Sequence, residues 1–293
     1  MAGELLEPEA LNRLMTEMRP RLHRYCARMV GSVFDGEDVV QEALAKAVEA
    51  LPSAGNIEKA EAWLFAIAHN TALDALRRRK RRAEVTLESD SPDIPDSATE
   101  ADSWIAATAS LATIMQLPVI QRSTVVLMDV LEYSLAETVE ILGTTLPAVK
   151  AALHRGRVRL KSLSEAGSPE QPELRGEEQA RLRSYADSFN TRDFDTLRNL
   201  LAEDVRLDLV NRLRLAGRKD VSVYFGRYGE SSDWEFSAGL AEGRPALLVS
   251  NPQNTSDVVD YVVLLDWSNG RIRSIRDFRY AKYITDGLTV IRL

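Results

Sequence analysis

Two runs of basic residues are the most chemically suggestive feature of the sequence. Six consecutive cations form the first run, from Arg77 to Arg82. The second run contains no acid and consists of Lys150, His154, Arg155, Arg157, Arg159 and Lys161. Guanidinium groups hold phosphates through paired hydrogen bonds and also reach base edges. Cations at a helix end can simply complement the helix dipole, but six in a row exceed that need. We therefore expect both runs to bind a nucleic acid.

An acid-rich segment, residues 35–48, offers the opposite chemistry. Acids at its start suit a helix N-terminus, and its apolar residues recur with helical spacing. The polar side carries Asp38, Gln41 and Glu42. Asp38 and Glu42 are four residues apart and repel each other slightly. A helix face that keeps this repulsion suits a basic partner. From these residues alone, it is equally well interpreted as a face that is simply exposed to solvent.

The helix expected from Glu61 to Arg82 must position the first basic run. Its predicted core stripe consists of Ala62, Phe65, Ala66, His69, Ala72, Leu73 and Leu76. His69 is accordingly interpreted as a packed or hydrogen-bonded core residue. The accessible side is expected to present Asn70, Thr71, Asp74, Arg77, Arg78 and Arg81.

The second basic run follows a helix–turn–helix pattern. Ser134 and Glu137 make a capping box, Gly143 marks the turn, and Pro147 suits the first turn of the next helix. In that second helix a buried stripe is expected at Val149, Leu153, Gly156, Leu160 and Leu163. The basic face can then enter a major groove, although a helical hairpin of this kind could also bind a protein.

The sequence of 293 residues divides into three blocks and two linkers. The expected boundaries are 7–83 (helical), 84–102 (acidic linker), 103–163 (helical), 164–175 (linker) and 176–293 (α+β). A net charge of −7 would oppose nucleic-acid binding if it were spread evenly, but the linker 84–102 concentrates acids and holds no base. In the last block, helices are expected first and a curved antiparallel sheet after them. Asn269-Gly270 predicts a tight hairpin within that sheet.

Composition also excludes several classes of protein. No apolar stretch approaches the roughly 20 residues needed to span a bilayer, and the N-terminus is acidic, so we expect a cytoplasmic protein that does not contact membranes. The single cysteine, Cys26, cannot form an internal disulfide and is interpreted as a packing residue. The three histidines show no metal-ligand spacing, so neither a metal nor a cofactor is expected.

The helical blocks resemble known transcription factors of bacteria. Residues 38–42 and 62–77 resemble region 2 of the sigma-70 family, extracytoplasmic-function (ECF) group, and residues 117–157 resemble region 4. The resemblance implies two all-α domains, a region 2 bundle and a region 4 helix–turn–helix. It also implies two macromolecular partners, promoter DNA and core RNA polymerase, the latter through its β′ clamp helices and β flap.

The resemblance assigns roles to individual residues. Asp38, Gln41 and Glu42 would bind polymerase. Capture of the −10 element would involve the loop from Asn56 and then Trp63, Asn70, Asp74, Arg77, Arg78 and Arg81. The −35 element would be read by Lys150, His154, Arg155 and Arg157. Val139 and Ala151-Ala152 depart from the family pattern, so no sequence preference carries over.

The last block resembles a SnoaL-like, ketosteroid-isomerase-like domain, through residues 178–209 and the segment Asp277-Phe278-Arg279-Tyr280. This implies a cone-shaped α+β fold around a cavity suited to a small apolar ligand. Candidate carboxylates are Asp208, Asp260 and Asp277, and candidate tyrosines are Tyr224, Tyr261 and Tyr280, with none assigned to catalysis. Asp277, Arg279 and Tyr280 are instead expected on a regulatory surface.

The expected function is therefore a non-enzymatic sigma factor controlled by its own C-terminal domain. An anti-sigma factor or a small ligand is left open as a further partner. One alternative is a ligand-responsive helix–turn–helix regulator, which would leave the Asp38–Glu42 face unexplained. Another is a SnoaL-like cyclase or isomerase with a DNA-binding appendage, which would need an acid–base pair that the sequence does not display.

Overall fold

The computed structural model describes residues 7–83, 109–164, 174–254 and 258–293. The chain forms two compact units, Met1–Pro169 and Glu170–Leu293. The expected acidic linker 84–102 and most of the expected linker 164–175 lie outside the described residues.

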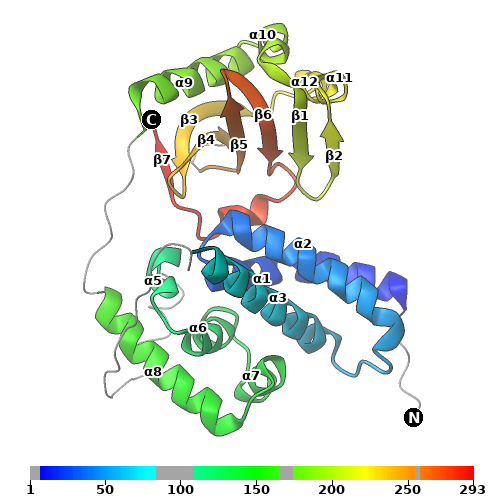
Figure 1. Cartoon of the computed structure of the whole chain (residues 1–293), viewed down its shortest axis with the longest axis vertical. Helices are drawn as coiled ribbons and strands as arrows, with labels where there is room; N and C mark the ends of the chain where they lie inside the picture. The colour runs from blue at the N-terminus through cyan, green and yellow to red at the C-terminus, as the bar shows by residue number, and fades with distance from the viewer. Residues whose placement is uncertain (1–6, 84–108, 165–173, 255–257) are drawn as a thin grey trace. The chain divides into compact units, whose positions relative to one another are not determined.

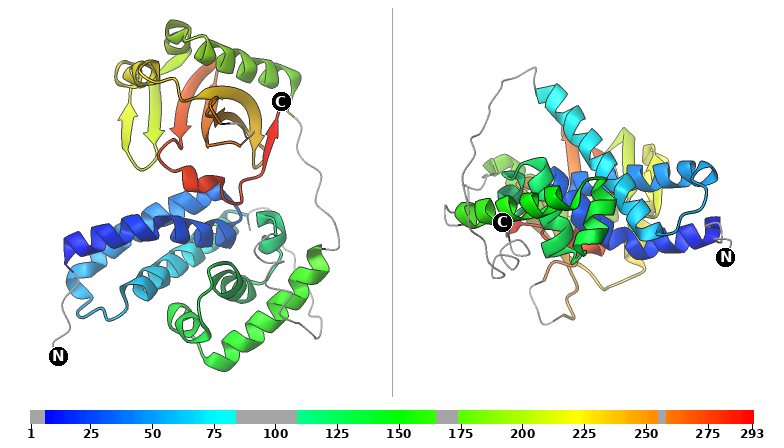
Figure 2. Two further views of the ribbon diagram at one scale, coloured as in Figure 1. Left: turned by 180° about the vertical axis from the view of Figure 1, so that it is seen from behind. Right: turned by 90° about the horizontal axis from the view of Figure 1, so that it is seen from below.

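Three long helices build the first part of the N-terminal unit: α1 (Pro8–Val30), α2 (Val33–Ala50) and α3 (Ala60–Ala83), with a short 3-10 turn η1 (Leu51–Ser53) after α2. They pack side by side, as Figures 1 and 2 show. Gly31 ends α1 with a φ of 81°, and the Ser32 side chain caps α2 by accepting from the Asp35 amide. This turn brings α1 and α2 into close contact, because Gly36 leaves no side chain between them and Ala27.

The second part of the unit begins with short helices and ends with a long one. Its elements are α5 (Leu111–Met115), α6 (Val119–Val125), a π-helical turn η3 (Val126–Val130), α7 (Leu135–Leu142) and the long helix α8 (Leu146–Ser164). The predicted capping box is confirmed, since Ser134 and Glu137 exchange both hydrogen bonds at the start of α7. Gly143 follows α7 with a φ of 58°, which a residue without Cβ adopts readily. The helix–turn–helix expected from the sequence is therefore present.

The two helical parts share one hydrophobic core. The Phe65 ring of α3 lies between two others, edge-on to Tyr133 at 5.0 Å and to Tyr25 at 5.9 Å. The Arg21 guanidinium stacks over Tyr133 at 4.8 Å, and Lys59 pairs with Glu140 of α7 at 2.6 Å. Blocks that the sequence separates by a linker thus pack as one unit.

The C-terminal unit combines helices with one sheet. Its helical elements are α9 (Gly176–Asn190), α10 (Phe194–Asn199), α11 (Arg218–Val221), α12 (Val223–Gly229) and the 3-10 turn η4 (Lys282–Thr285). Its strands are β1 (Leu201–Leu209), β2 (Leu213–Ala216), β3 (Glu235–Ala241), β4 (Arg244–Ser250), β5 (Tyr261–Ser268), β6 (Arg271–Asp277) and β7 (Val290–Arg292). Helix α9 lies against β3 and β4 (Figure 1).

The seven strands are ordered β2-β1-β6-β5-β4-β3-β7. The predicted hairpin is confirmed between β5 and β6, where Asn269 and Gly270 have φ values of 52° and 73°. The expectation of an antiparallel sheet is wrong at one place, because β1 and β6 run parallel. Their connection passes through β2, two helices and β3 to β5, and so long a crossover can return the chain in either direction.

Candidate functional site

The acidic face of α2 is partly exposed and partly tied into the fold. Asp38 is exposed, whereas Gln41 and Glu42 are half-buried. Glu37 points inward and is completely buried, where it pairs with Arg19 at 2.8 Å. Gln41 donates to the same Glu37 carboxylate at 3.3 Å. Of the three predicted polymerase-binding residues, Asp38 therefore offers the most accessible charge.

Glu42 links α2 to the basic end of α3. Its carboxylate accepts two hydrogen bonds from Arg78, at 2.7 and 3.3 Å, and also pairs with Lys46 at 2.8 Å. Partial burial acts to raise the pKa of Glu42, but the hydrogen bonds and positive charges of Arg78 and Lys46 outweigh it. The pKa of Glu42 is therefore lower than its ordinary value, and the carboxylate is ionised when the pair is formed.

The other predicted −10 residues of α3 differ in how accessible they are. Asn70 is exposed, Trp63 is half-buried against the core, and Asp74 pairs with Arg77 at 3.1 Å. Arg77 and Arg81 are exposed. Thr71 was expected on the accessible side, but it is 1% exposed and donates to the Ile67 carbonyl. Thr71 faces α2, where Lys46 donates to its hydroxyl at 3.4 Å, so the buried face of α3 is wider than its apolar spacing indicates.

His69 is the core residue that the sequence predicts. Its Nδ1 lies 2.7 Å from the Tyr25 hydroxyl, and burial lowers the pKa of its imidazole to about 4. Cys26 is also fully buried, and burial raises the pKa of its thiol. Both residues stabilise the bundle from inside.

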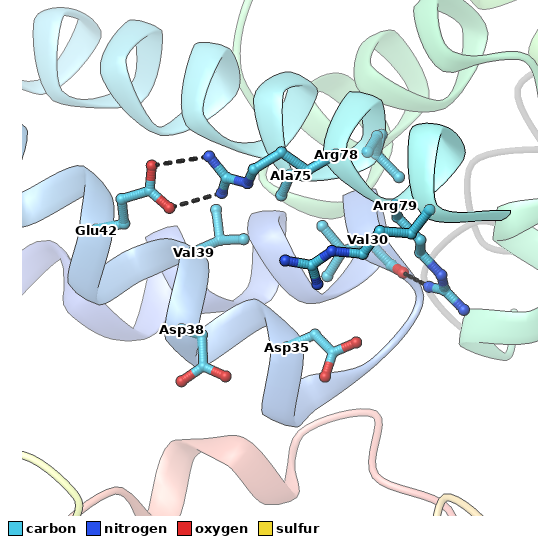
Figure 3. A pocket seen from close by; sticks show the side chains of 10 residues that line it. Val30, Asp35, Asp38, Val39, Glu42, Ala75, Arg78 and Arg79 are labelled. Atoms are coloured by element: carbon cyan, nitrogen blue, oxygen red, sulfur yellow. Dashed lines mark hydrogen bonds and ion pairs between the residues drawn. The ribbon is translucent and has the colours of Figure 1, made fainter. Parts of the chain in front are cut away.

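A cavity of about 370 Å³ lies between α2 and α3 (Figure 3). Asp35 and Asp38 lie on one side, and Arg78 and Arg79 reach it from the other. Arg79 also donates to the Val30 carbonyl at 3.2 Å. The predicted polymerase-binding and DNA-binding side chains thus meet at one groove with acidic and basic walls.

Helix α8 presents the second basic run. Lys150 and Arg155 are exposed, and His154 is half-buried. Arg157 forms two hydrogen bonds to Asp129, at 2.5 and 3.0 Å, and the Asp129 side chain is only 1% exposed. A buried carboxylate of this kind holds its cation firmly, so Arg157 anchors α8 to η3, the turn that contains Asp129.

In the C-terminal unit, the expected surface position of Asp277 is wrong. Asp277 is completely buried, because its carboxylate accepts from three donors that close around it. These donors are the hydroxyls of Tyr224 (2.8 Å) and Tyr228 (2.7 Å) and the Arg279 amide (2.8 Å). Burial raises the pKa of Asp277 despite these hydrogen bonds.

Tyr261 completes the cluster, with its hydroxyl 3.2 Å from that of Tyr228. Two of the candidate tyrosines, Tyr224 and Tyr261, are thus gathered near Asp277, together with Tyr228, which was not among the candidates predicted from the sequence. Its spacing of four from Tyr224 along a short helix is the signal that would have identified it. Asp208 and Asp260 lie elsewhere, the first paired with Arg214 and the second accepting from the Asn251 amide.

Arg279 and Tyr280 lie closer to the surface than Asp277. Arg279 pairs with Asp233 at 3.0 Å and stacks over Tyr228, and its side chain is 22% exposed. Tyr280 is 49% exposed and lies against the Arg212 guanidinium. These two residues remain available for the predicted regulatory surface.

Comparison with known proteins identifies the helical regions. Residues 14–82 match the family model Sigma-70 region 2, and residues 110–160 match Sigma-70, region 4. The ECF RNA polymerase sigma factor SigM of Mycobacterium tuberculosis is 32% identical over 154 residues, which cover 53% of this chain and 76% of SigM. The chain therefore belongs to the ECF sigma factor family.

Two further proteins are similar over longer stretches. SigG of M. tuberculosis is 29% identical over 216 residues, which cover 64% of this chain but only 57% of SigG. The match to the crystal structure of the M. tuberculosis ECF sigma factor SigJ covers 91% of this chain and 95% of the SigJ chain, with 18% identity and a TM-score of 0.35.

The described residues contain neither a helix that could span a membrane nor a cluster of metal ligands. None of the helices in this part of the chain combines the length and apolar composition that a bilayer crossing requires. Within the same residues, no group of three or more His, Cys, Asp or Glu is arranged to hold a metal ion.

Proposed function

We propose that this chain binds core RNA polymerase and directs it to promoter DNA, without catalysing a reaction itself. Membership of the ECF sigma factor family supports the proposal. The observation that carries it is the distribution of charge in the N-terminal unit. Acidic Asp38 is exposed on α2, while Arg77, Arg81 and Lys150 are exposed cations on α3 and α8.

Each charged surface fits one partner. The acidic residues of α2 suit a basic surface on polymerase, for which the β′ clamp helices are the proposed site. Cations of α3 and α8 suit the phosphates of the −10 and −35 regions, because neutralising phosphates releases bound counterions. Within this scheme Lys150 and Arg155 bind DNA directly, while Arg157 positions α8 through Asp129.

Asp38→Lys tests the polymerase surface. Placing like charges opposite each other at an interface costs several kcal/mol, so we expect Asp38→Lys to weaken capture of core polymerase at least tenfold. Purified core polymerase and the tagged full chain are the components, and the bound fraction is measured over a concentration series.

Glu17→Lys makes the same charge change at an exposed position of α1 and serves as the control. Circular dichroism should show unchanged helicity for both variants. Capture of polymerase by Asp38→Lys at the level of Glu17→Lys would mean that α2 does not form the polymerase surface.

We also propose that the C-terminal unit regulates the N-terminal one. A short covalent connection gives the two units a high effective concentration for each other, so even a weak contact would be populated. Arg279 and the exposed Tyr280 are the proposed contact residues, and an anti-sigma factor or a small ligand would act by changing that contact. Asp277 acts only indirectly, because it holds the Arg279 amide from inside.

A further inference from the structure

Five side chains of alternating charge connect α2 to α3. Arg78 pairs with Glu42, Glu42 pairs with Lys46, and Lys46 approaches Asp74 at 3.9 Å. Asp74 in turn pairs with Arg77 at 3.1 Å. Lys46 also donates to the Thr71 hydroxyl at 3.4 Å, which fixes its ammonium between the two helices. Figure 3 shows the two parallel hydrogen bonds between Glu42 and Arg78.

This network joins residues that the proposed function gives to different partners. Glu42 belongs to the polymerase surface, whereas Arg78 belongs to the DNA surface. The Glu42 carboxylate occupies the edge of the Arg78 guanidinium that is formed by its two terminal nitrogens, so a phosphate cannot bind at that edge while the pair is formed. The carboxylate also cancels most of the charge that a phosphate would meet.

We propose that Glu42 withholds Arg78 from DNA in the free chain, so that the full basic surface of α3 forms only when another cation takes Arg78's place on Glu42. This inference rests on the proposed function, in which a basic group of polymerase is that cation. Binding of polymerase and binding of DNA would then be positively coupled, and by linkage DNA would strengthen polymerase binding by the same factor.

The geometry suits an exchange of partners. The Glu42 and Arg78 side chains are 35% and 42% exposed, so an incoming group can reach both of them. Ion pairs this exposed contribute little net stability, because water competes for both charges. Lys46 stays on Glu42 when Arg78 leaves, which keeps the carboxylate partly neutralised.

The experiment measures DNA binding by the free, full-length chain without polymerase. The probe is a labelled DNA duplex of arbitrary sequence, titrated at several NaCl concentrations. The variants are Glu42→Gln, Glu49→Gln, Arg78→Gln and the double variant Glu42→Gln with Arg78→Gln. Glu49 is the matched control, because it is exposed on the same face of α2 about two turns further along and its change removes the same charge.

Glu42→Gln should bind the duplex severalfold more tightly than Glu49→Gln. Its plot of log affinity against log salt should be steeper by about one unit, the value for one added phosphate contact. Arg78→Gln alone should change the duplex affinity little relative to the wild type. In the Glu42→Gln background it should abolish the gain in affinity. Equal affinities and slopes for Glu42→Gln and Glu49→Gln, including no binding by either, would overturn the inference.

The duplex assay contains no polymerase, so its outcome is independent of the capture assay on Asp38→Lys. If the proposed function is wrong, Asp38→Lys will capture polymerase normally. The effect of Glu42→Gln on duplex affinity can still be measured in that case. If only this inference is wrong, the duplex affinities of Glu42→Gln and Glu49→Gln will be equal while Asp38→Lys still captures polymerase weakly.

Discussion

A buried carboxylate surrounded by phenol groups is the most unusual residue-scale feature of the C-terminal unit. Asp277 ends β6 and accepts from Tyr224, Tyr228 and the Arg279 amide. Desolvation disfavours the charged form, and the three hydrogen bonds only partly compensate for it. The cluster therefore ties α12, β5 and β6 together and depends on the protonation state of one group.

The stability of the C-terminal unit should consequently depend on pH through Asp277. Because the pKa of Asp277 is raised in the folded state, its contribution is fully present below the ordinary value of 3.8 and is lost as pH rises through the raised pKa. Asp277→Asn cannot ionise, so its unfolding free energy should fall less steeply with pH above that value. Urea unfolding at a series of pH values measures this dependence.

Tryptophan fluorescence reports on the C-terminal unit alone in a background with Trp63→Phe and Trp104→Phe, because the remaining Trp234 and Trp267 both lie in that unit. Asp187→Asn, at an exposed position of α9, is the matched control and should keep the wild-type dependence. If Asp277→Asn also kept it, the carboxylate would not be the group that titrates.

At the scale of elements, the close approach of α1 and α2 depends on one glycine. A Cβ added at Gly36 would lie 2.6 Å from Cα and 2.7 Å from the amide nitrogen of Ala27. These are backbone atoms, so neither can rotate away as a side chain would. The two helices would have to separate, and α2 carries the residues that we propose to bind polymerase.

Gly36→Ala should therefore lower the free energy of unfolding by about 1–3 kcal/mol, the usual cost of overpacking a core. Glycine-to-alanine changes within helices otherwise raise the free energy of unfolding by about 1 kcal/mol. The sign of the change at Gly36 therefore distinguishes a close helix contact from an ordinary helical position. Gly226→Ala in α12 is the control, since its added Cβ would meet nothing within 4 Å. Chemical denaturation followed by far-UV circular dichroism measures both changes, and a stabilised Gly36→Ala would contradict this packing.

Local patterns predicted elements and caps well, because those depend on neighbouring residues. The capping box at Ser134, the turn at Gly143 and the hairpin at Asn269-Gly270 all follow from short-range rules. Contacts between distant segments were not predictable in this way. The parallel pairing of β1 with β6 and the burial of Thr71 against α2 both depend on tertiary packing.

The same distinction holds for the candidate site. Helical spacing placed Asp38 and Asn70 on exposed faces, because a period of 3.6 residues fixes the side of a helix. It could not indicate that Arg78 pairs with Glu42 or Arg157 with Asp129, since these partners are 36 and 28 residues apart. Likewise, Tyr224 and Tyr228 of α12 are 53 and 49 residues from Asp277 in the sequence.

At the scale of the whole molecule, the two sigma regions form one unit with a continuous core. Phe65 of α3 packs on Tyr133, and Lys59 pairs with Glu140 of α7. Helix α7 thus contacts the segment before Trp63 that is proposed to capture the −10 element. The C-terminal unit is a second compact body with its own aromatic core, in which Phe189 stacks on Phe236 with ring centres 4.1 Å apart.

Removal of the C-terminal unit should separate its role from initiation itself. A chain ending at Ser164 keeps every element of the N-terminal unit. In transcription with core polymerase it should remain active, with its output changed severalfold relative to the full chain. Equal output from both chains would leave the C-terminal unit without the proposed regulatory role.

Run-off transcription with purified core polymerase tests the central claim most directly. Genomic fragments that carry promoter regions from the source organism serve as templates, with core polymerase alone as the reference. We expect the full chain to produce discrete transcripts with defined start sites that core polymerase alone does not make. Asp38→Lys should reduce these transcripts at least tenfold, because it captures core polymerase more weakly. A chain that binds these fragments but never yields a polymerase-dependent transcript would contradict the account and favour a helix–turn–helix regulator instead.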